Sequence, residues 1–275
     1  MPEPHDEQRD DYAEGRRGSL LPQPTSAMQK RPNNPLRLSL QVGLVFAIIG
    51  LVGVGFVGMN NRSQSFARRT GSANNLKMIG LAIQYYGENR GELPSNTYSA
   101  DGKGLLSWRV HLLPYLEHDN IYKQFKLDEP WDSPSNIRLL NQMPFVYHEG
   151  GQHGQSMTHY RGFSSPGAVF ERRLIQGQER EENDRLRIQD LADGPENTIL
   201  VVEAGDPIEW TKPDDLDASP GKPFPRMGGL GWRKVFQALM ADGSVRRLRL
   251  DTPEPTLRAL VTHSGGETLP SDWHD

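Results

Sequence analysis

The feature that most constrains this chain is a long apolar run near its N-terminus. Leu38–Met59 contains 22 residues without a formally charged side chain. An α-helix rises about 1.5 Å per residue, so about 20 such residues cross a hydrocarbon core of about 30 Å. A buried helix of a soluble domain would be shorter and would present a polar face. We therefore expect a transmembrane helix over residues 38–59.

Residues 1–37, which precede this run, are expected to form a disordered polar tail. Their prolines and mixed charges leave too little apolar surface to build a core. The apolar run begins too far from the N-terminus for a secretory signal peptide. Basic residues are nearly balanced on its two sides, so the positive-inside rule does not fix its orientation. They are Lys30, Arg31 and Arg37 before it, and Arg62, Arg68, Arg69 and Lys77 after it.

Residues 60–275 are expected to form one α+β domain with long loop insertions. Apolar residues at 76, 79, 83 and 86 predict an amphipathic helix that continues from the membrane span, with an interruption at Gly71-Ser72. Asp242-Gly243 predicts a hairpin turn, and a closing helix is expected over 256–264. Charged or Pro-rich insertions are expected at 165–195 and 205–229. Strand-like runs occur at 145–147, 158–163, 198–202, 235–240 and 245–250.

Composition and motifs exclude several classes of function. The chain has no cysteine, which excludes disulfides, thiolate metal sites and cysteine nucleophiles. Its net charge is −4, and no basic stripe interleaves with aromatic residues, so we expect no nucleic-acid partner. The sequence contains no Gly-x-Ser-x-Gly elbow, phosphate-binding loop or dinucleotide fingerprint in the required context. We therefore expect that the protein is not an enzyme.

Six separate segments carry a family resemblance. They are Ala73–Ala82, Leu106–Glu117, Leu127–Pro134, Glu196–Ala204, Trp210–Pro213 and Ala241–Val245. In this order they resemble the DUF1559 family, also called SBP_bac_10, the prepilin-like proteins of planctomycetes. The resemblance covers about residues 60–267. It implies a pilin-like architecture, with a long N-terminal helix packed on a mainly antiparallel sheet outside the cytoplasmic membrane. It implies little about activity.

The chain departs from the family pattern at two places. Prepilin-like relatives carry a Gly-Phe-Thr-Leu-Val-Glu-like peptidase signal at the edge of the apolar helix, whereas Pro35–Leu40 contains neither Gly-Phe nor Glu. We therefore expect an uncleaved membrane anchor here. The family also has a histidine before its Asp-Gly turn, and Trp232 stands in that position.

Four acidic residues are candidate metal ligands. Asp128, Glu129 and Asp132 surround Trp131, in a turn that resembles the Asp-Pro-Trp turn near the calcium loop of type II secretion pseudopilins. Calcium prefers six to eight oxygen ligands, and this turn offers several. The alternative is a capped turn with Trp131 packed on the core. Asp242 is the fourth candidate, and its alternative role is a hydrogen bond within its own turn.

Four further residues are candidate ligand contacts: Trp108, Arg109, Glu203 and Trp210. Trp108 and Trp210, together with Trp131 and Trp232, would line a carbohydrate or peptide groove, or else anchor the core. Glu203 follows an apolar run and would face a ligand from the end of a strand. Its alternative role is a structural salt bridge with an arginine such as Arg109.

Two functional hypotheses follow. The first is a membrane-anchored, pilin-like envelope protein that contacts other envelope or secretion-system proteins, with its C-terminal domain outside the membrane. The second is a module that captures a solute or carbohydrate outside the membrane. A binding module should show a concave pocket lined by aromatic and convergent polar groups. A structural module should show an exposed apolar patch instead.

Overall fold

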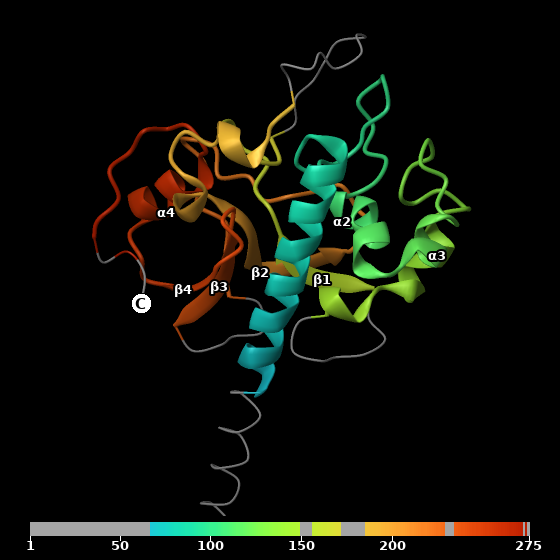
Figure 1. Cartoon of the computed structure of the whole chain (residues 1–275), viewed down its shortest axis with the longest axis horizontal. Helices are drawn as coiled ribbons and strands as arrows, with labels where there is room; N and C mark the ends of the chain where they lie inside the picture. The colour runs from blue at the N-terminus through green and yellow to red at the C-terminus, as the bar shows by residue number, and fades with distance from the viewer. Residues whose placement is uncertain (1–66, 149–155, 172–184, 229–233, 272, 274–275) are drawn as a thin grey trace, which may run out of the picture. The chain divides into compact units, whose positions relative to one another are not determined.

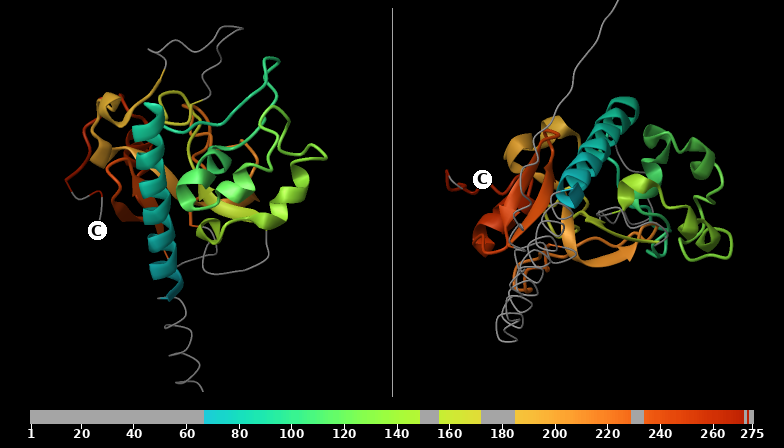
Figure 2. Two further views of the ribbon diagram at one scale, coloured as in Figure 1. Left: turned by 45° about the vertical axis from the view of Figure 1, so that its right-hand side comes forward. Right: turned by 90° about the horizontal axis from the view of Figure 1, so that it is seen from below.

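The computed structural model describes residues 67–148, 156–171, 185–228, 234–271 and 273. Four antiparallel strands form one sheet in the order β1-β2-β3-β4 (Figure 1). A long helix over residues 67–90 crosses one face of this sheet (Figure 2). The predicted α+β class with an antiparallel sheet is confirmed. The strands are β1 (Met157–Arg161), β2 (Ile199–Glu209), β3 (Val235–Met240) and β4 (Val245–Arg249).

Short helices and 3₁₀ turns connect the long helix and the strands. α2 (Trp108–His111) begins at Ser107, whose hydroxyl accepts a hydrogen bond from the Arg109 amide at 3.2 Å. α3 (Asp119–Tyr122) follows, and α4 (Glu254–Val261) closes the fold. The 3₁₀ turns are η1 (Leu113–Leu116), η2 (Ile137–Gln142), η3 (Phe145–Tyr147), η6 (Ile188–Asp190) and η7 (Pro195–Asn197).

The long helix follows the predicted apolar periodicity. Leu76, Ile79 and Ile83 are fully buried against the sheet. Gly80 lies so close to β3 that a Cβ atom there would stand 2.9 Å from a methyl carbon of Leu239. The predicted interruption at Gly71-Ser72 is wrong, because the helix runs without a break from 67 to 90. A glycine inside a helix costs only about 1 kcal/mol, which packing along the rest of the helix offsets.

The sheet separates two apolar clusters because side chains alternate between its faces. Leu239 and Ala241 belong to the cluster under the long helix and α2. Phe236, Ala238 and Met240 belong to the cluster that also contains residues of α4. Both faces of β3 are therefore buried.

Two predicted elements differ from the structure. Residues 145–147 form a 3₁₀ turn rather than a strand, because Pro144 turns the chain and its carbonyl accepts from the Tyr147 amide at 3.0 Å. β2 extends to Glu209, into a region predicted to be an insertion. The predicted transmembrane run, 38–59, lies outside the described residues. Within the described ranges, no helix is long and apolar enough to cross a membrane.

Candidate functional site

Arg109 lies in α2 and is fully buried. Its Nε donates to the carbonyl of Trp210 at 2.9 Å. Its two terminal nitrogens donate to the carbonyls of Tyr160 and Lys212, each at 3.1 Å. One terminal nitrogen lies 3.6 Å from Oδ1 of Asp215. The guanidinium thus ties α2 to β1 and to the segment that follows β2.

Asp215 completes this charged centre. Its carboxylate accepts from Asn96 Nδ2 at 2.7 Å, from Gly162 N at 3.0 Å and from Trp108 Nε1 at 3.3 Å. Burial lowers the pKa of Arg109 below its ordinary value, and the negative charge of Asp215 opposes that shift. Arg109 and Asp215 therefore form a buried ion pair. Removing either residue would strongly destabilise the fold, because the other charge would stay buried without a partner.

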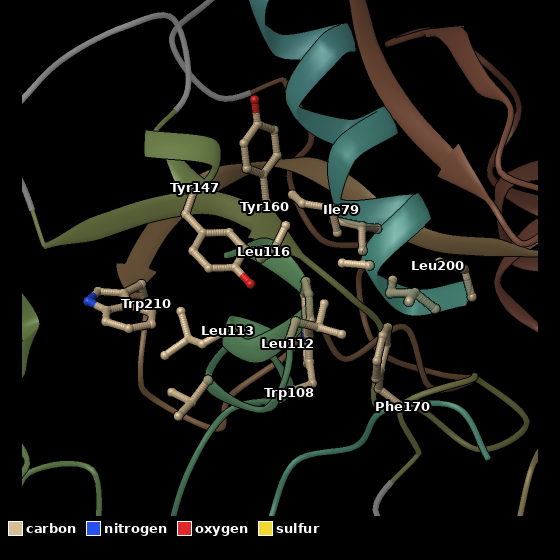
Figure 3. Close-up of a cluster of buried hydrophobic side chains, with 14 of the residues drawn as sticks. Ile79, Trp108, Leu112, Leu113, Leu116, Tyr147, Tyr160, Phe170, Leu200 and Trp210 are labelled. Carbon is tan, nitrogen blue, oxygen red and sulfur yellow. The ribbon is translucent and has the colours of Figure 1, made fainter. Parts of the chain in front are cut away.

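Trp108 and Trp210 lie inside the core, not on the surface (Figure 3). Trp108 stacks on Phe170 with ring centroids 5.1 Å apart, and Trp210 stacks on Tyr147 at 6.0 Å. The Trp210 Nε1 donates to the Leu140 carbonyl at 3.0 Å. Both indoles are fully buried, so neither forms the wall of an open groove in this structure. Ligand binding by these tryptophans and by Arg109 stays a prediction.

Glu203 is also buried, but it lies within β2 rather than at its end. Its carboxylate accepts hydrogen bonds from the Ser72 hydroxyl, from the backbone N–H of Gln237 at 2.9 Å and from the side-chain Nε2 of Gln237 at 3.2 Å. The Ser72 hydroxyl also lies 2.7 Å from the Tyr160 hydroxyl. Arg109, the example given for a salt-bridge partner of Glu203, lies beside Asp215 instead. Contact of Glu203 with a ligand stays a prediction.

Burial raises the pKa of Glu203 above its ordinary value of 4.5. Hydrogen bonds from Ser72 and Gln237 and the positive charge of Arg69 oppose this shift without cancelling it. Gln237 Nε2 also donates to the Arg69 carbonyl at 3.0 Å. This network fastens the first described turns of the long helix to β2 and β3.

The acidic turn around Trp131 is organised by a buried asparagine. Asn136 Nδ2 donates to the carbonyls of Lys126, Glu129 and Pro130 at 2.9, 3.2 and 3.1 Å. These carbonyls are the kind of oxygen a calcium ion would require, and the amide already engages them. Ser133 donates to the Glu129 carboxylate at 2.8 Å. This geometry favours the packed turn over the metal loop.

Nor do the candidate metal ligands converge. No group of three His, Asp or Glu side chains in the described ranges is arranged to hold a metal ion. Asp242 accepts from the Ser244 amide at 2.8 Å within the β3–β4 turn, where Gly243 has a φ of 84°. Asp242 thus makes the hydrogen bond within its own turn that was the alternative to metal binding. Calcium binding by Asp128, Glu129, Asp132 or Asp242 stays a prediction.

A groove of about 390 Å³ opens beside Trp131. The Lys212 ammonium lies 5.9 Å from the centre of the Trp131 ring and 3.4 Å from the Asp214 carboxylate. Of the predicted site residues only Asp132 lines this groove. Trp131 and the Trp210–Pro213 segment were the signals in the sequence that pointed to it. The other lining residues are Tyr98, Gly102, Lys103, Gly104, Ser164, Pro213 and the buried Asp215.

The outer face of the long helix carries an exposed apolar stripe, formed by Met78, Leu81 and Tyr85. These side chains are 53%, 48% and 54% exposed. Their spacing of three and four residues places them on one face of the helix. Sequence reasoning missed the stripe because it followed only the apolar residues that face the core.

Comparison with known proteins identifies one family. Residues 65–229 match the model of SBP_bac_10, described as a protein of unknown function (DUF1559). The match includes the long helix, the Arg109 centre, β2 and the whole groove beside Trp131. No curated protein and no solved structure matches the chain.

Proposed function

Because the chain belongs to the DUF1559 (SBP_bac_10) family, whose function is unknown, we propose a function from its own surface. The protein is a membrane-anchored, pilin-like envelope protein whose domain docks onto another envelope or secretion-system protein. The observation that carries this proposal is the exposed stripe of Met78, Leu81 and Tyr85. The domain performs no catalysis.

The stripe has the form of a helix-docking surface. Apolar residues three and four positions apart are the contacts that one helix presents to the apolar face of another. Each of the three side chains is about half exposed, so covering them would contribute roughly 3 kcal/mol before the cost of association. This is enough for a contact between two proteins held on one membrane, where the effective concentration is high.

The predicted anchor supports this arrangement. The apolar run Leu38–Met59 ends a few residues before the described part of the long helix begins at 67. A span in that position would tether the domain to the membrane. Carbonate-washed membranes should retain the full chain, and protease added to intact spheroplasts should digest the domain outside. Full protection of the domain would contradict the outward orientation.

The docking proposal is tested by the size of the complex extracted from native membranes. We expect the wild-type chain to migrate above its monomer mass on a native gel. Leu81→Glu combined with Tyr85→Glu should reduce it to the monomer. Ile137→Glu is the matched control, because Ile137 is a similarly exposed apolar residue off the long helix. A wild-type monomer, or equal loss in the control, would contradict the proposal.

A second candidate function, capture of a small solute outside the membrane, is favoured by one observation. The groove beside Trp131 is concave, and it combines an aromatic ring with polar side chains from four separate segments. This is the arrangement expected of a small-molecule site. Docking through the stripe and capture in the groove use different surfaces.

A further inference from the structure

We propose that the groove beside Trp131 binds an uncharged saccharide, with one sugar ring stacked on the Trp131 indole. The inference rests on the second candidate function, solute capture, and names the ligand class and the residues that would recognise it. It does not depend on the stripe of the long helix.

The walls of the groove are held in place by contacts within the domain. Tyr98 and Gly104 pair as an antiparallel bridge, and the Tyr98 hydroxyl donates to the Pro213 carbonyl at 3.4 Å. A Cβ atom on Gly104 would stand 2.7 Å from Cγ of Pro213, so only glycine permits this close approach. The groove is therefore formed before any ligand arrives, which limits the entropic cost of binding.

The floor is fixed by the charged centre below it. Asp215 lines the groove and is buried, and its oxygens accept hydrogen bonds from Asn96, Trp108 and Gly162. A carboxylate held in this way does not swing to meet a ligand. The groups that would adapt to a ligand are those on the rim.

The aromatic platform is Trp131. Its indole packs against the larger apolar cluster yet stays partly exposed at the groove. The Lys212 ammonium lies over the ring at 5.9 Å, and Asp214 holds that ammonium at 3.4 Å. Asp214 in turn lies 3.4 Å from Arg161. An aromatic ring flanked by an ammonium donor and a carboxylate acceptor offers a stacking surface and both hydrogen-bonding partners.

The charges on the rim balance. Lys103 and Lys212 supply two positive charges, and Asp132 and Asp214 supply two negative charges. The charge of Asp215 is matched by Arg109. A cationic ligand would meet the ammonium groups of Lys103 and Lys212, and an anionic ligand would meet the carboxylates of Asp132 and Asp214. Balanced charge favours a neutral, polar ligand.

Size and chemistry narrow this to a saccharide. A volume of about 390 Å³ lies within the usual range for small-molecule sites and accommodates one or two sugar rings. One face of a pyranose presents C–H groups that pack on an aromatic ring. Its hydroxyls both donate and accept, so they suit carboxylates and ammonium groups side by side. Neutral oligosaccharides meet all of these requirements together.

The test is binding by the full chain in a detergent without a sugar head group, since sugar detergents would compete. Maltotriose, cellotriose, mannotriose and chitotriose are the saccharide probes, and glutamate, lysine and inorganic phosphate are the charged probes. Saturation-transfer NMR detects the bound saccharides and amino acids, and phosphorus NMR line broadening detects bound phosphate; titration with each probe gives its affinity. We expect at least one saccharide to bind and none of the charged probes to bind comparably.

Two variants locate the site. Trp131→Leu should weaken saccharide binding at least tenfold, and Lys212→Met should weaken it severalfold while leaving the packing of Trp131 in place. Trp273→Leu is the matched control, because Trp273 also lies under a cation, with Arg246 at 5.3 Å. It should leave the affinity unchanged. Thermal melts of each variant establish that it is folded.

The outcomes separate the ligand class from solute capture itself. Saccharide binding that falls with Trp131→Leu and Lys212→Met but not with Trp273→Leu supports the inference. Binding of a charged probe that depends on Trp131 would overturn the saccharide class and keep solute capture. Binding unaffected by Trp131→Leu and Lys212→Met, or no binding of any probe, would overturn the groove as the site.

Discussion

Arg109 and Glu203 are both buried, but their side chains have different kinds of partners. Arg109 has a carboxylate partner 3.6 Å away and three carbonyl acceptors. Glu203 has only neutral hydrogen-bond donors, from Ser72 and Gln237. The first centre is a paired charge, and the second is a carboxyl for which burial outweighs its hydrogen bonds.

The difference shows which part of the fold should respond to pH. Removing one member of a buried ion pair leaves the other charge without compensation. The Arg109–Asp215 pair should therefore be disrupted only by mutation. Glu203 can instead become neutral by taking up a proton, so its network should respond to pH. That network holds the start of the described helix, whose outer face carries the proposed docking stripe.

The largest effect should come from breaking the paired centre. Arg109→Met leaves Asp215 buried without its cation and should lower the free energy of unfolding by about 3–5 kcal/mol. Urea unfolding of the full chain in detergent measures the change. Arg249→Met is the control, because Arg249 and Asp251 form an exposed pair that should contribute less than about 1 kcal/mol. Similar losses of unfolding free energy in both variants would contradict a larger contribution from the buried pair.

A smaller effect is expected at His111, which lies in α2 beside the paired centre. Burial, followed by the positive charge of Arg90, lowers the pKa of His111 from 6.5 to about 4. The unfolded chain binds this proton more readily, so the contribution to stability is complete above pH 6.5 and is lost as the pH falls toward 4. The loss should reach up to roughly 3 kcal/mol. Unfolding titrations of His111→Phe should lack this part of the pH dependence.

Glu203 should act with the opposite sign, and more weakly because its hydrogen bonds and Arg69 offset part of the burial. The folded state holds the Glu203 proton more tightly than the unfolded chain. Its contribution to stability is therefore complete below pH 4.5 and is lost as the pH rises through the raised pKa. Glu203→Gln should remove this loss and stay within about 1 kcal/mol of wild type at acidic pH. If the difference in unfolding free energy between the wild type and Glu203→Gln does not change with pH, Glu203 is not the pH-responsive group.

The smallest change should come from Ser72→Ala. It removes the hydrogen bond to Glu203 and the one with the Tyr160 hydroxyl, and it should cost about 1 kcal/mol. Because that bond lowers the pKa of Glu203, its loss should also move the pH midpoint of the Glu203 transition upward. Carboxyl-detected NMR of the full chain follows that midpoint. A midpoint that moves downward would show that Ser72 does not stabilise the charged form.

Local patterns in the sequence predicted much of the fold. The buried face of the long helix and the β3–β4 hairpin follow from short-range periodicity and from Asp242-Gly243. The polar centres were not predictable in this way. Asp215 lies 107 positions from Trp108, and Glu203 lies 131 positions from Ser72, so only the tertiary fold brings each pair together. Trp108 and Trp210 illustrate the same limit, because side-chain type alone does not distinguish a core anchor from a groove wall.

The most direct measurement of the proposed function is photo-crosslinking in native membranes. A photoreactive side chain is placed at Leu81 of the full chain, and separately at Ile137 as the control. The docking proposal predicts one discrete cross-linked protein from position 81 and none from position 137. Absence of any product at 81, or the same products at both positions, would contradict it.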